Sequence, residues 1–218
     1  MKQQLIGKQQ HDELLLFFAG WGLDAHPFEH LQPLHEDFMI CYDYRDLLFD
    51  TQQLLSYQKI RVLAWSLGVW AAAKVLPETA LPITRSIAVN GTLSPIHDEK
   101  GIPCDIFQGT IDHLNERNLM KFQRRMCYTP AVYEDYLQRA PQRTLEDVKE
   151  ELICLKDYIQ EANHESAWKW DRAYISTHDF IFPCENQQQA WQGKTEIHTL
   201  QEGHYCPLLF NELISHDQ

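Results

Sequence analysis

A serine lies at the junction of a strand-like run and a helix-like run, in the segment Ala64-Trp65-Ser66-Leu67-Gly68. This is the setting of a nucleophile elbow, a sharp strand-to-helix turn that exposes a serine hydroxyl. The usual pattern is Gly-x-Ser-x-Gly, and here Ala64 takes the place of the first glycine. The segment predicts a nucleophile at Ser66, but standing alone it is a weak match.

A serine hydroxyl becomes a good nucleophile only when a base removes its proton and an acid orients that base. Asp179 follows the strand-like run 173–177, and His204 follows the strand-like run 196–200. The chain order is therefore Ser, Asp, His, with one helix-like segment between the last two strands, as this type of site requires. We predict that Ser66, Asp179 and His204 form a catalytic triad.

Simpler interpretations exist for each of the three residues. A serine after a strand often serves as a turn residue or helix cap, and His204 is one of eleven histidines. Asp179 could cap the turn that follows it, and Asp171 and Glu202 are other acids nearby. The choice of Asp179 over Glu202 stays open at this point.

The segment Phe18-Ala19-Gly20-Trp21-Gly22 supplies a fourth element. Acyl transfer develops an oxyanion, which backbone N–H donors stabilise. In such a site one donor is the amide after the nucleophile, here Leu67, and the other lies in the loop after an early strand. The two glycines let that loop bend, so the amide of Trp21 is the expected second donor. The alternative is a glycine-rich turn with a packed tryptophan.

Strand-like and helix-like runs alternate along the N-terminal and C-terminal parts of the chain, which indicates a mostly parallel, doubly wound α/β sheet. Strands are expected at 14–19, 38–42, 60–65, 85–90, 173–177 and 196–200. Helices are expected at 28–34, 67–76 and 183–191, and after Cys206.

The pattern changes between about 92 and 170, where the chain looks helical throughout. Helices are expected at 102–111, 114–127 and 131–139, and after Thr144, with Asp147 completing an approximate capping box. About 80 residues between two strands far exceed a simple crossover. We therefore predict one domain over residues 1–218 with a helical cap inserted at about 92–170.

Composition excludes several classes of protein. The formal net charge of −12 argues against a general nucleic-acid binder. The first apolar run, 14–19, is too short for a signal peptide or membrane span. The six cysteines form no C-x-x-C pair and favour reduced thiols in a cytoplasmic protein. No sequence cluster calls for a metal or cofactor.

Charge is distributed unevenly, because residues 113–143 carry a net charge of +3 within an acidic chain. Such a patch could steer an anionic partner to the cap, although charge runs are more often solvated helix faces. The six basic residues are Arg117, Lys121, Arg124, Arg125, Arg139 and Arg143.

Several segments together resemble one family. They are 17–22, 64–68, 88–92, Gly101-Ile102-Pro103, 120–127 and the regions of Asp179 and His204. The sequence resembles the BioG-type pimeloyl-[acyl-carrier protein] methyl ester esterases, small α/β hydrolases of biotin synthesis, over nearly its whole length. The Gly-Ile-Pro and Phe-x-Arg-Arg-Met-Cys segments are more specific than the elbow, and alanine at the first elbow position fits this family.

The resemblance implies hydrolysis of a methyl ester on pimeloyl-carrier protein. Acyl carrier proteins are acidic, so the six basic cap residues would receive the carrier or its phosphopantetheine phosphate. A tunnel that places the ester carbonyl beside Ser66 would spare the thioester. Expected wall residues are Trp21, Trp65, Leu67 and Phe107.

Other functions remain open from the sequence. The same triad would serve a generic short-chain carboxylesterase or a carbon–carbon lyase of the menaquinone-pathway type. A third possibility is a non-catalytic protein that binds acyl carrier protein on a hydrolase scaffold, although the intact Ser, Asp, His order argues against it.

Overall fold

The computed structural model of the chain describes residues 1–7, 9–162 and 166–215. Over these residues the strands form one seven-stranded sheet in the order β1-β3-β2-β4-β5-β6-β7. Six strands run parallel, and β1 pairs with β3 in the antiparallel direction. The bounds are β1 Lys2–Ile6, β2 Glu13–Phe18, β3 Asp37–Tyr42, β4 Lys59–Trp65, β5 Ile83–Val89, β6 Arg172–Ser176 and β7 Glu196–Leu200.

The central strands are apolar because helices cover both faces of a parallel sheet. Residues 14–18 of β2 and 60–65 of β4 are fully buried or nearly so. The predicted fold class, a mostly parallel α/β sheet, is confirmed. The strand β1 was not predicted, because its residues Lys2, Gln3 and Gln4 are polar and it forms an edge strand through backbone pairing with β3.

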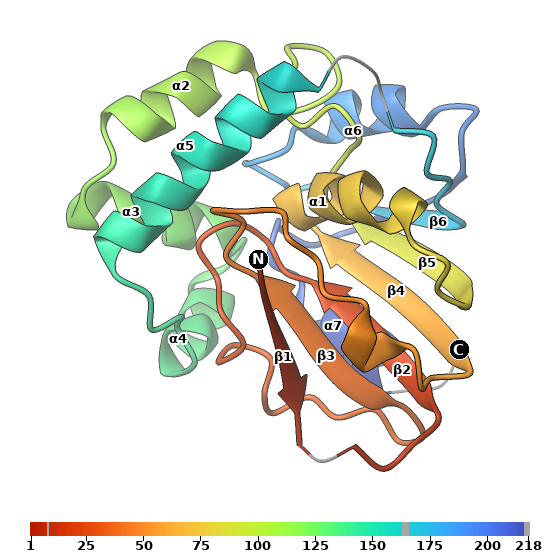
Figure 1. Cartoon of the computed structure of the whole chain (residues 1–218). Coiled ribbons are helices and arrows are strands. Elements are labelled where there is room, and N and C mark those ends of the chain that lie inside the picture. The colour runs from red at the N-terminus through yellow and green to blue at the C-terminus, as the bar shows by residue number, and fades with distance from the viewer. Residues whose placement is uncertain (8, 163–165, 216–218) are drawn as a thin grey trace.

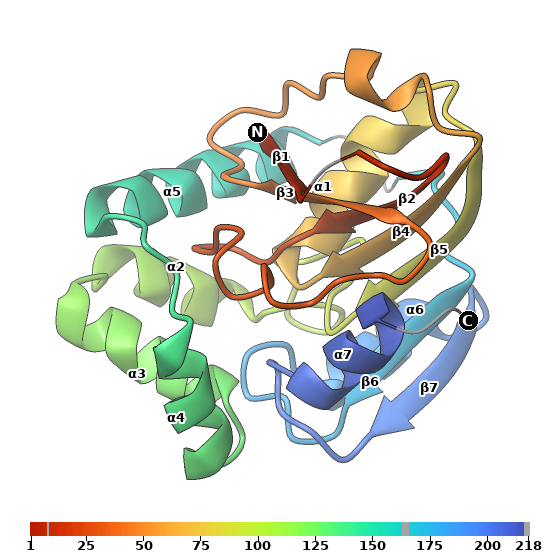
Figure 2. The same cartoon turned by 90° about the horizontal axis from the view of Figure 1, so that it is seen from below.

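Helices flank the sheet and gather at one end of it (Figures 1 and 2). The helix α1 lies on one face and α7 on the other (Figure 2). The bounds of the helices outside the long insertion are α1 Leu67–Val75, α6 Cys184–Trp191 and α7 Pro207–Ser215. Aromatic rings fill the space between β2 and α7, where the ring centroids of Phe17 and Phe210 lie 6.0 Å apart.

Four helices, α2 to α5, follow β5 and precede β6, and they cluster at the end of the sheet to which the parallel strands point (Figures 1 and 2). Their bounds are α2 Cys104–Asp112, α3 Glu116–Met126, α4 Pro130–Gln138 and α5 Leu145–Glu161. We call these four helices the cap. The predicted span of about 92–170 also includes 163–165, which lie outside the described residues.

Side chains cap the helices of this insertion. Thr144 Oγ1 accepts a hydrogen bond from the Asp147 N–H at 3.1 Å, so the predicted start of the long helix is correct. Thr129 and Asn115 cap α4 and α3 in the same way. Such caps satisfy backbone donors that a helix leaves free at its first turn.

The prediction of a helix at 28–34 is wrong. Residues 26–30 form turns instead, with N–H groups of Phe28 and Leu31 bonded to carbonyls three residues back. Pro33 lies inside the predicted helix and removes a backbone donor that the helix would use. The apolar side chains that suggested a helix face, Phe28 and Leu31, are buried in the core all the same.

No helix among the described residues combines the length and hydropathy that crossing a membrane would need.

Candidate active site

The turn between β4 and α1 has the geometry of a nucleophile elbow. Ser66 adopts φ 60° and ψ −130°, a backbone conformation that residues other than glycine rarely take. Leu67 is the first residue of α1, where backbone N–H groups lack intrahelical acceptors. The strained turn therefore exposes the Ser66 hydroxyl to a cavity. It also places the N–H groups at the start of α1 beside the same cavity.

Two glycines let the elbow pack closely against its surroundings. A Cβ on Gly68 would lie 2.4 Å from the carbonyl oxygen of Phe18, and one on Gly91 would lie 2.2 Å from the carbonyl oxygen of Ser66. Neither backbone oxygen can move without disturbing β2 or the elbow itself. The second glycine of the elbow pattern is thus required by the approach of α1 to β2.

Substituting Gly68 by alanine should lower the free energy of unfolding by about 2–3 kcal/mol, because the new methyl overlaps backbone atoms. Gly109 is a matched control, since it lies in α2 and a Cβ added to it would meet nothing within 4 Å. Gly109→Ala should raise stability by about 0.5–1 kcal/mol. Chemical denaturation of both variants checks the pair, and equal effects would contradict the steric requirement for glycine at position 68.

His204 bridges the other two predicted triad members. Its Nε2 lies 2.9 Å from Ser66 Oγ and its Nδ1 lies 2.8 Å from Asp179 Oδ2. A carboxylate only accepts hydrogen bonds, so Nδ1 carries the proton and Nε2 accepts from the serine hydroxyl. The arrangement is that of a nucleophile, a base and an orienting acid.

The surroundings hold the His204 ring and the Asp179 carboxylate in place. The His204 ring stacks on the Phe182 ring, with 5.9 Å between the ring centroids and an interplanar angle of 7°. Asp179 Oδ1 accepts from the N–H groups of Ile181 and Phe182, both at 2.8 Å, and Oδ2 also accepts from Gln187 Nε2 at 3.1 Å. The acid is thus fixed on three sides as well as by the histidine.

The two other acids near Asp179 in sequence do not contact His204. Asp171 accepts hydrogen bonds from the backbone and side chain of Ser86, at the start of β6. The carboxyl of Glu202 is half-buried, and burial raises its pKa above the usual value. The structure brings Asp179, and neither of the alternatives, to the histidine.

Several residues that support these three were not predicted from the sequence. Asn90 has φ 46°, and its side-chain amide donates to the carbonyl oxygen of His204 at 2.9 Å and to Ser176 Oγ at 2.9 Å. The Trp65 indole donates to the same His204 carbonyl at 2.9 Å. An Asn-Gly pair directly after a strand was the available signal, since asparagine tolerates positive φ.

The loop 19–22 lies directly against Ser66, because a Cβ on Gly20 would be 3.1 Å from the Ser66 Cβ. Within the described part of the chain, the amides of Trp21 and Leu67 have no hydrogen-bond acceptor. Both residues line the cavity that contains Ser66. Their positions suit two donors that await an oxyanion.

A narrow cavity lies beside Ser66 and His204, and part of it is open to solvent. All four expected wall residues, Trp21, Trp65, Leu67 and Phe107, line it. The cap contributes further apolar wall residues, which are Ile106, Phe122, Met126 and Leu152. The cap therefore roofs the site, and its mainly apolar lining suits an uncharged alkyl chain.

Four of the six predicted basic residues share one face of α3, at positions 117, 121, 124 and 125. All four are exposed, and none has an ion-pair partner among the described residues. Arg125 lines the cavity of Ser66 and also two neighbouring hollows, of which one includes Lys121 and the other Arg124. The structure thus brings a basic helix face to the mouth of the site.

The other two basic residues are engaged elsewhere. Arg139 pairs with Asp135 at 2.9 Å. The Arg143 side chain is only 6% exposed and pairs with Glu151 at 2.5 Å and Asp43 at 3.0 Å. The expectation that Arg143 receives a carrier is corrected here, because a buried, paired guanidinium offers no surface to a partner.

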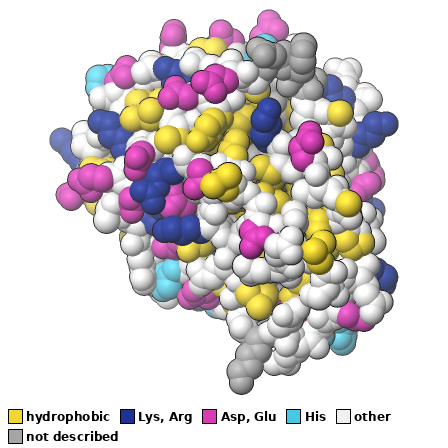
Figure 3. All heavy atoms as spheres, in the orientation of Figure 1, with side chains coloured by type: hydrophobic (Ala, Val, Ile, Leu, Met, Phe, Trp, Pro, Cys, Tyr) yellow, Lys and Arg dark blue, Asp and Glu magenta, His cyan; other side chains and the backbone are white. Residues whose placement is uncertain are grey.

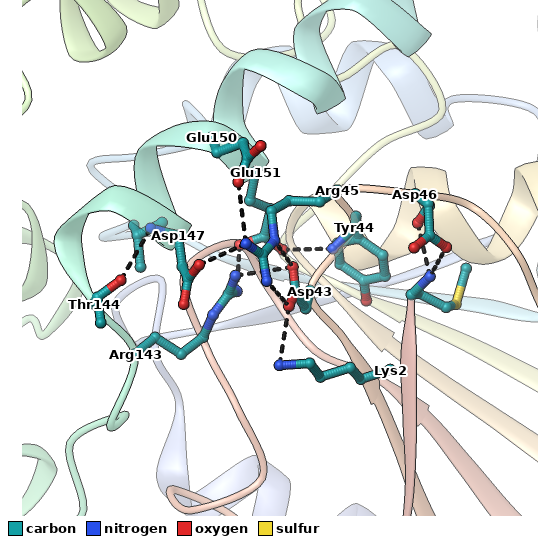
Figure 4. A network of polar contacts seen from close by, with 12 residues as sticks. Lys2, Asp43, Tyr44, Arg45, Asp46, Arg143, Thr144, Asp147, Glu150 and Glu151 are labelled. Carbon is teal, nitrogen blue, oxygen red and sulfur yellow. Dashed lines mark hydrogen bonds and ion pairs between the residues drawn. The ribbon is translucent and has the colours of Figure 1, made fainter.

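Arg143 belongs to a network of charges that joins α5 to the loop after β3 (Figure 4). On the molecular surface, acidic and basic side chains lie side by side over the beginning of α5 (Figure 3). Asp43 receives three cations: Arg45 at 2.7 Å, Arg143 at 3.0 Å and Lys2 at 3.2 Å. The network fixes the cap to the sheet domain.

Asp43 should make folding stability sensitive to acid. Burial disfavours its charged form, but hydrogen bonds from Arg45 and the charge of Arg143 outweigh this and hold the pKa of Asp43 well below its ordinary 3.8. The carboxylate therefore adds stability above about pH 3.8, and this is lost as pH falls through the folded-state pKa. In urea titrations, Asp43→Asn should flatten the fall in unfolding free energy below pH 4, whereas exposed Asp12→Asn should leave it unchanged. A wild-type slope in Asp43→Asn would contradict this assignment.

Within the described residues, no three His, Cys, Asp or Glu side chains are arranged to hold a metal ion. All six cysteines are unpaired.

Comparison with known proteins gives one family and several relatives. A family model described as "Pimeloyl-ACP methyl esterase BioG" matches residues 1–216. A Bacteroides fragilis (strain 638R) protein named malonyl-[acyl-carrier protein] O-methyltransferase is 48% identical over 201 residues, which are 92% of this chain and 41% of that protein. The chain thus spans less than half of that relative. A Haemophilus influenzae (strain KW20 Rd) protein described as uncharacterized is 39% identical, with 90% of each chain covered.

Solved structures agree in fold. The crystal structure of selenomethionine BioG from Haemophilus influenzae is similar at a TM-score of 0.90 and 38% identity, covering 97% of both chains. An esterase from Exiguobacterium antarcticum reaches a TM-score of 0.69 at 14% identity, covering 93% of this chain and 87% of that one. The second likeness shows the fold alone, which is that of α/β hydrolases.

Proposed function

The chain belongs to the BioG family of pimeloyl-ACP methyl esterases, and from this premise we propose that it removes the methyl group from pimeloyl-[acyl-carrier protein] methyl ester. The reaction releases methanol and a free pimeloyl carboxylate, which serves biotin synthesis. The observation that supports this proposal most is the His204 bridge between Ser66 Oγ and Asp179 at the base of an apolar cavity.

In the proposed mechanism Ser66 Oγ attacks the ester carbonyl while His204 Nε2 takes the hydroxyl proton. Asp179 stabilises the resulting imidazolium through Nδ1. The carbonyl oxygen becomes an oxyanion, which the amides of Trp21 and Leu67 stabilise; a single such donor is worth about 10²–10³ in rate. His204 then gives its proton to the departing methoxide, and methanol leaves.

The second half of the reaction frees the enzyme. Water attacks the acyl-enzyme carbonyl, and His204 takes the water proton as base. The tetrahedral intermediate collapses, Ser66 Oγ recovers its proton from His204, and the pimeloyl carboxylic acid that forms loses its remaining proton to solvent and becomes a carboxylate. A carboxylate is unfavourable in the apolar cavity, so its formation promotes product release.

The cap supports selection of the distal ester over the thioester. The uncharged methyl ester end enters the cavity beside Ser66, and the phosphopantetheine arm extends outward past Arg125. The acidic carrier protein then meets the basic face of α3. Because the acyl chain fixes the distance between the two ends, the ester carbonyl and not the thioester lies at the nucleophile.

Mass spectrometry of purified protein with methyl pimeloyl-carrier protein tests the proposal. Wild type should remove one methylene's mass from the acylated carrier, and Ser66→Ala should not. Rates on short p-nitrophenyl esters identify a generic esterase, which would favour them over the carrier-bound ester. An unchanged carrier mass with wild type would reject this substrate.

Reversing charge on α3 should weaken capture of the carrier. The double variant Lys121→Glu/Arg124→Glu should lower kcat/KM for the carrier-bound ester by about 10–100-fold, mainly through KM, and added salt should shrink the difference. Hydrolysis of a short ester should stay unchanged, because neither residue lines the cavity of Ser66.

Lys59→Glu is the matched control for the α3 variant, since exposed Lys59 begins β4 at the opposite end of the strands. Steady-state kinetics on both substrates make the comparison. Equal losses in the control and the double variant would show a general effect of protein charge and contradict a docking face on α3.

A further inference from the structure

The helix α5 contacts the loop after β2. The Trp21 indole donates to the carbonyl oxygen of Val148 at 2.7 Å. The next residue, Gly22, has φ 76° and donates its N–H to Glu151 Oε2 at 3.0 Å. Val148 and Glu151 are three residues apart on one face of α5, so a single helix face holds both residues.

Glu151 is fully buried, and its second oxygen extends the contact. Oε1 accepts from the Tyr44 N–H at 2.9 Å, and the Tyr44 hydroxyl donates to the carbonyl oxygen of Ala19 at 2.7 Å. Arg143, which pairs with Glu151, also donates to the carbonyl oxygen of Leu23 at 3.3 Å. Glu151 therefore holds the loop directly at Gly22, while Tyr44 holds it at Ala19 and Arg143 holds it at Leu23. Figure 4 shows Glu151 together with Tyr44 and Arg143.

A buried carboxylate on the apolar face of a helix is costly unless every lone pair and its charge are compensated. Glu151 lies among Val148, Leu152 and Leu155, which are buried core residues. A hydrophobic residue there would pack against the same core, but it would leave the N–H groups of Gly22 and Tyr44 without acceptors. The carboxylate thus does what no apolar side chain could: it accepts from two backbone amides, one in the loop after β2 and one in the loop after β3.

We propose that Glu151 is a positioning residue of the oxyanion hole, which aims the amide of Trp21 at the reacting carbonyl by holding the adjacent Gly22 peptide. The inference rests on the proposed function in one respect, the role of the Trp21 amide as a donor. Its consequence is that the cap and the oxyanion hole form one assembly. A donor displaced by a fraction of an ångström loses much of its effect on the transition state while substrate still binds.

The variant Glu151→Gln tests this, with p-nitrophenyl butyrate as substrate and butaneboronic acid as a mimic of the tetrahedral intermediate. One acceptor oxygen is lost and the amide nitrogen must face a backbone N–H or Arg143. We expect kcat to fall by about 10–100-fold with KM within about 2-fold of wild type. Boronate affinity should fall by the same factor as kcat, because its adduct places an oxygen in the oxyanion hole.

Glu150→Gln is the matched control, the same change one residue earlier on α5, at an exposed side chain paired only with Arg45 among the described residues. It should leave kcat and boronate affinity unchanged. Should Glu151→Gln fail to fold by circular dichroism, Glu151→Asp replaces it. Aspartate keeps the charge opposite Arg143 but withdraws the carboxylate by one methylene, and should give a smaller loss with the same pattern.

A folded Glu151 variant with wild-type kcat and boronate affinity would overturn the inference, and so would a rise in KM at constant kcat. The butyrate ester keeps this result separate from the proposed substrate. If wild type hydrolysed p-nitrophenyl butyrate but not methyl pimeloyl-carrier protein, the proposed function would fail while the role of Glu151 could still be measured.

Discussion

Ser66→Ala should lower kcat for methyl pimeloyl-carrier protein and for short esters by about 10⁵–10⁶-fold. The hydroxyl is the only group at the base of the cavity that His204 Nε2 contacts, at 2.9 Å, within the described residues. Without it no acyl-enzyme can form, and the oxyanion donors alone give a small residual rate. Burst kinetics and labelling by a fluorophosphonate probe measure the loss, since wild type should be labelled at Ser66.

The variant should keep its fold, because alanine has the same backbone restriction as serine. Ser66→Gly should be equally inactive but more stable than Ser66→Ala, since glycine adopts φ 60° and ψ −130° without strain. Ser56→Ala, at an exposed serine, is the control and should keep full activity. Activity above about 1% of wild type in Ser66→Ala would reject a serine mechanism.

Asp179→Asn should lower kcat by about 10³–10⁴-fold with little change in KM. Asparagine can donate to Nδ1 of His204, which places the ring proton on Nε2 and leaves no base for the serine hydroxyl. The backbone donors Ile181 and Phe182 still find an oxygen on the new side chain, so the loop should keep its shape. Steady-state kinetics on the carrier-bound ester and on a short ester should show the same factor.

Glu202→Gln is the control for the acid. Glu202 is the other carboxyl close to His204 in sequence, and its side chain makes no contact with the imidazole. We expect kcat within about 3-fold of wild type, because a half-buried acid that does not touch the base contributes little to it. A loss in Glu202→Gln equal to that in Asp179→Asn would move the role of the acid to Glu202.

Most secondary structure could be predicted from local patterns. The run 14–18 is apolar, and so is 60–65 apart from Arg61, because both faces of their strands are covered; such runs are recognisable without any knowledge of neighbours. Thr144 and Pro207 mark helix starts by side-chain chemistry alone. Two segments could not be predicted from local patterns. At 26–30 the spacing of buried Phe28 and Leu31 resembles a helix face, although the residues form turns. The edge strand β1 is polar and gave no signal.

The supporting residues of the site could not be predicted in this way. Gln187 and Asn90 bind residues from other elements of the fold, and their types suit many surface positions equally well. Arg143 counted as part of a basic patch, although its neighbours in space are acids from two other segments. The net charge of a segment depends only on its composition. Whether a charged side chain is buried or forms an ion pair depends on the elements that pack against the segment.

The sequence by itself determined most strands and helices, the resemblance to one family, and the candidate residues Ser66, Asp179 and His204, because each of these residues follows a recognisable strand end or turn. Only the tertiary structure decided that Asp179 rather than Glu202 meets the histidine, that α3 rather than Arg143 faces the mouth of the cavity, and that Glu151 holds the loop of Trp21. The physical reason is distance along the chain. A turn or cap is set by residues within a few positions, while hydrogen bonds across 25 to 138 residues, such as those of His204, exist only after the sheet and the cap have packed together.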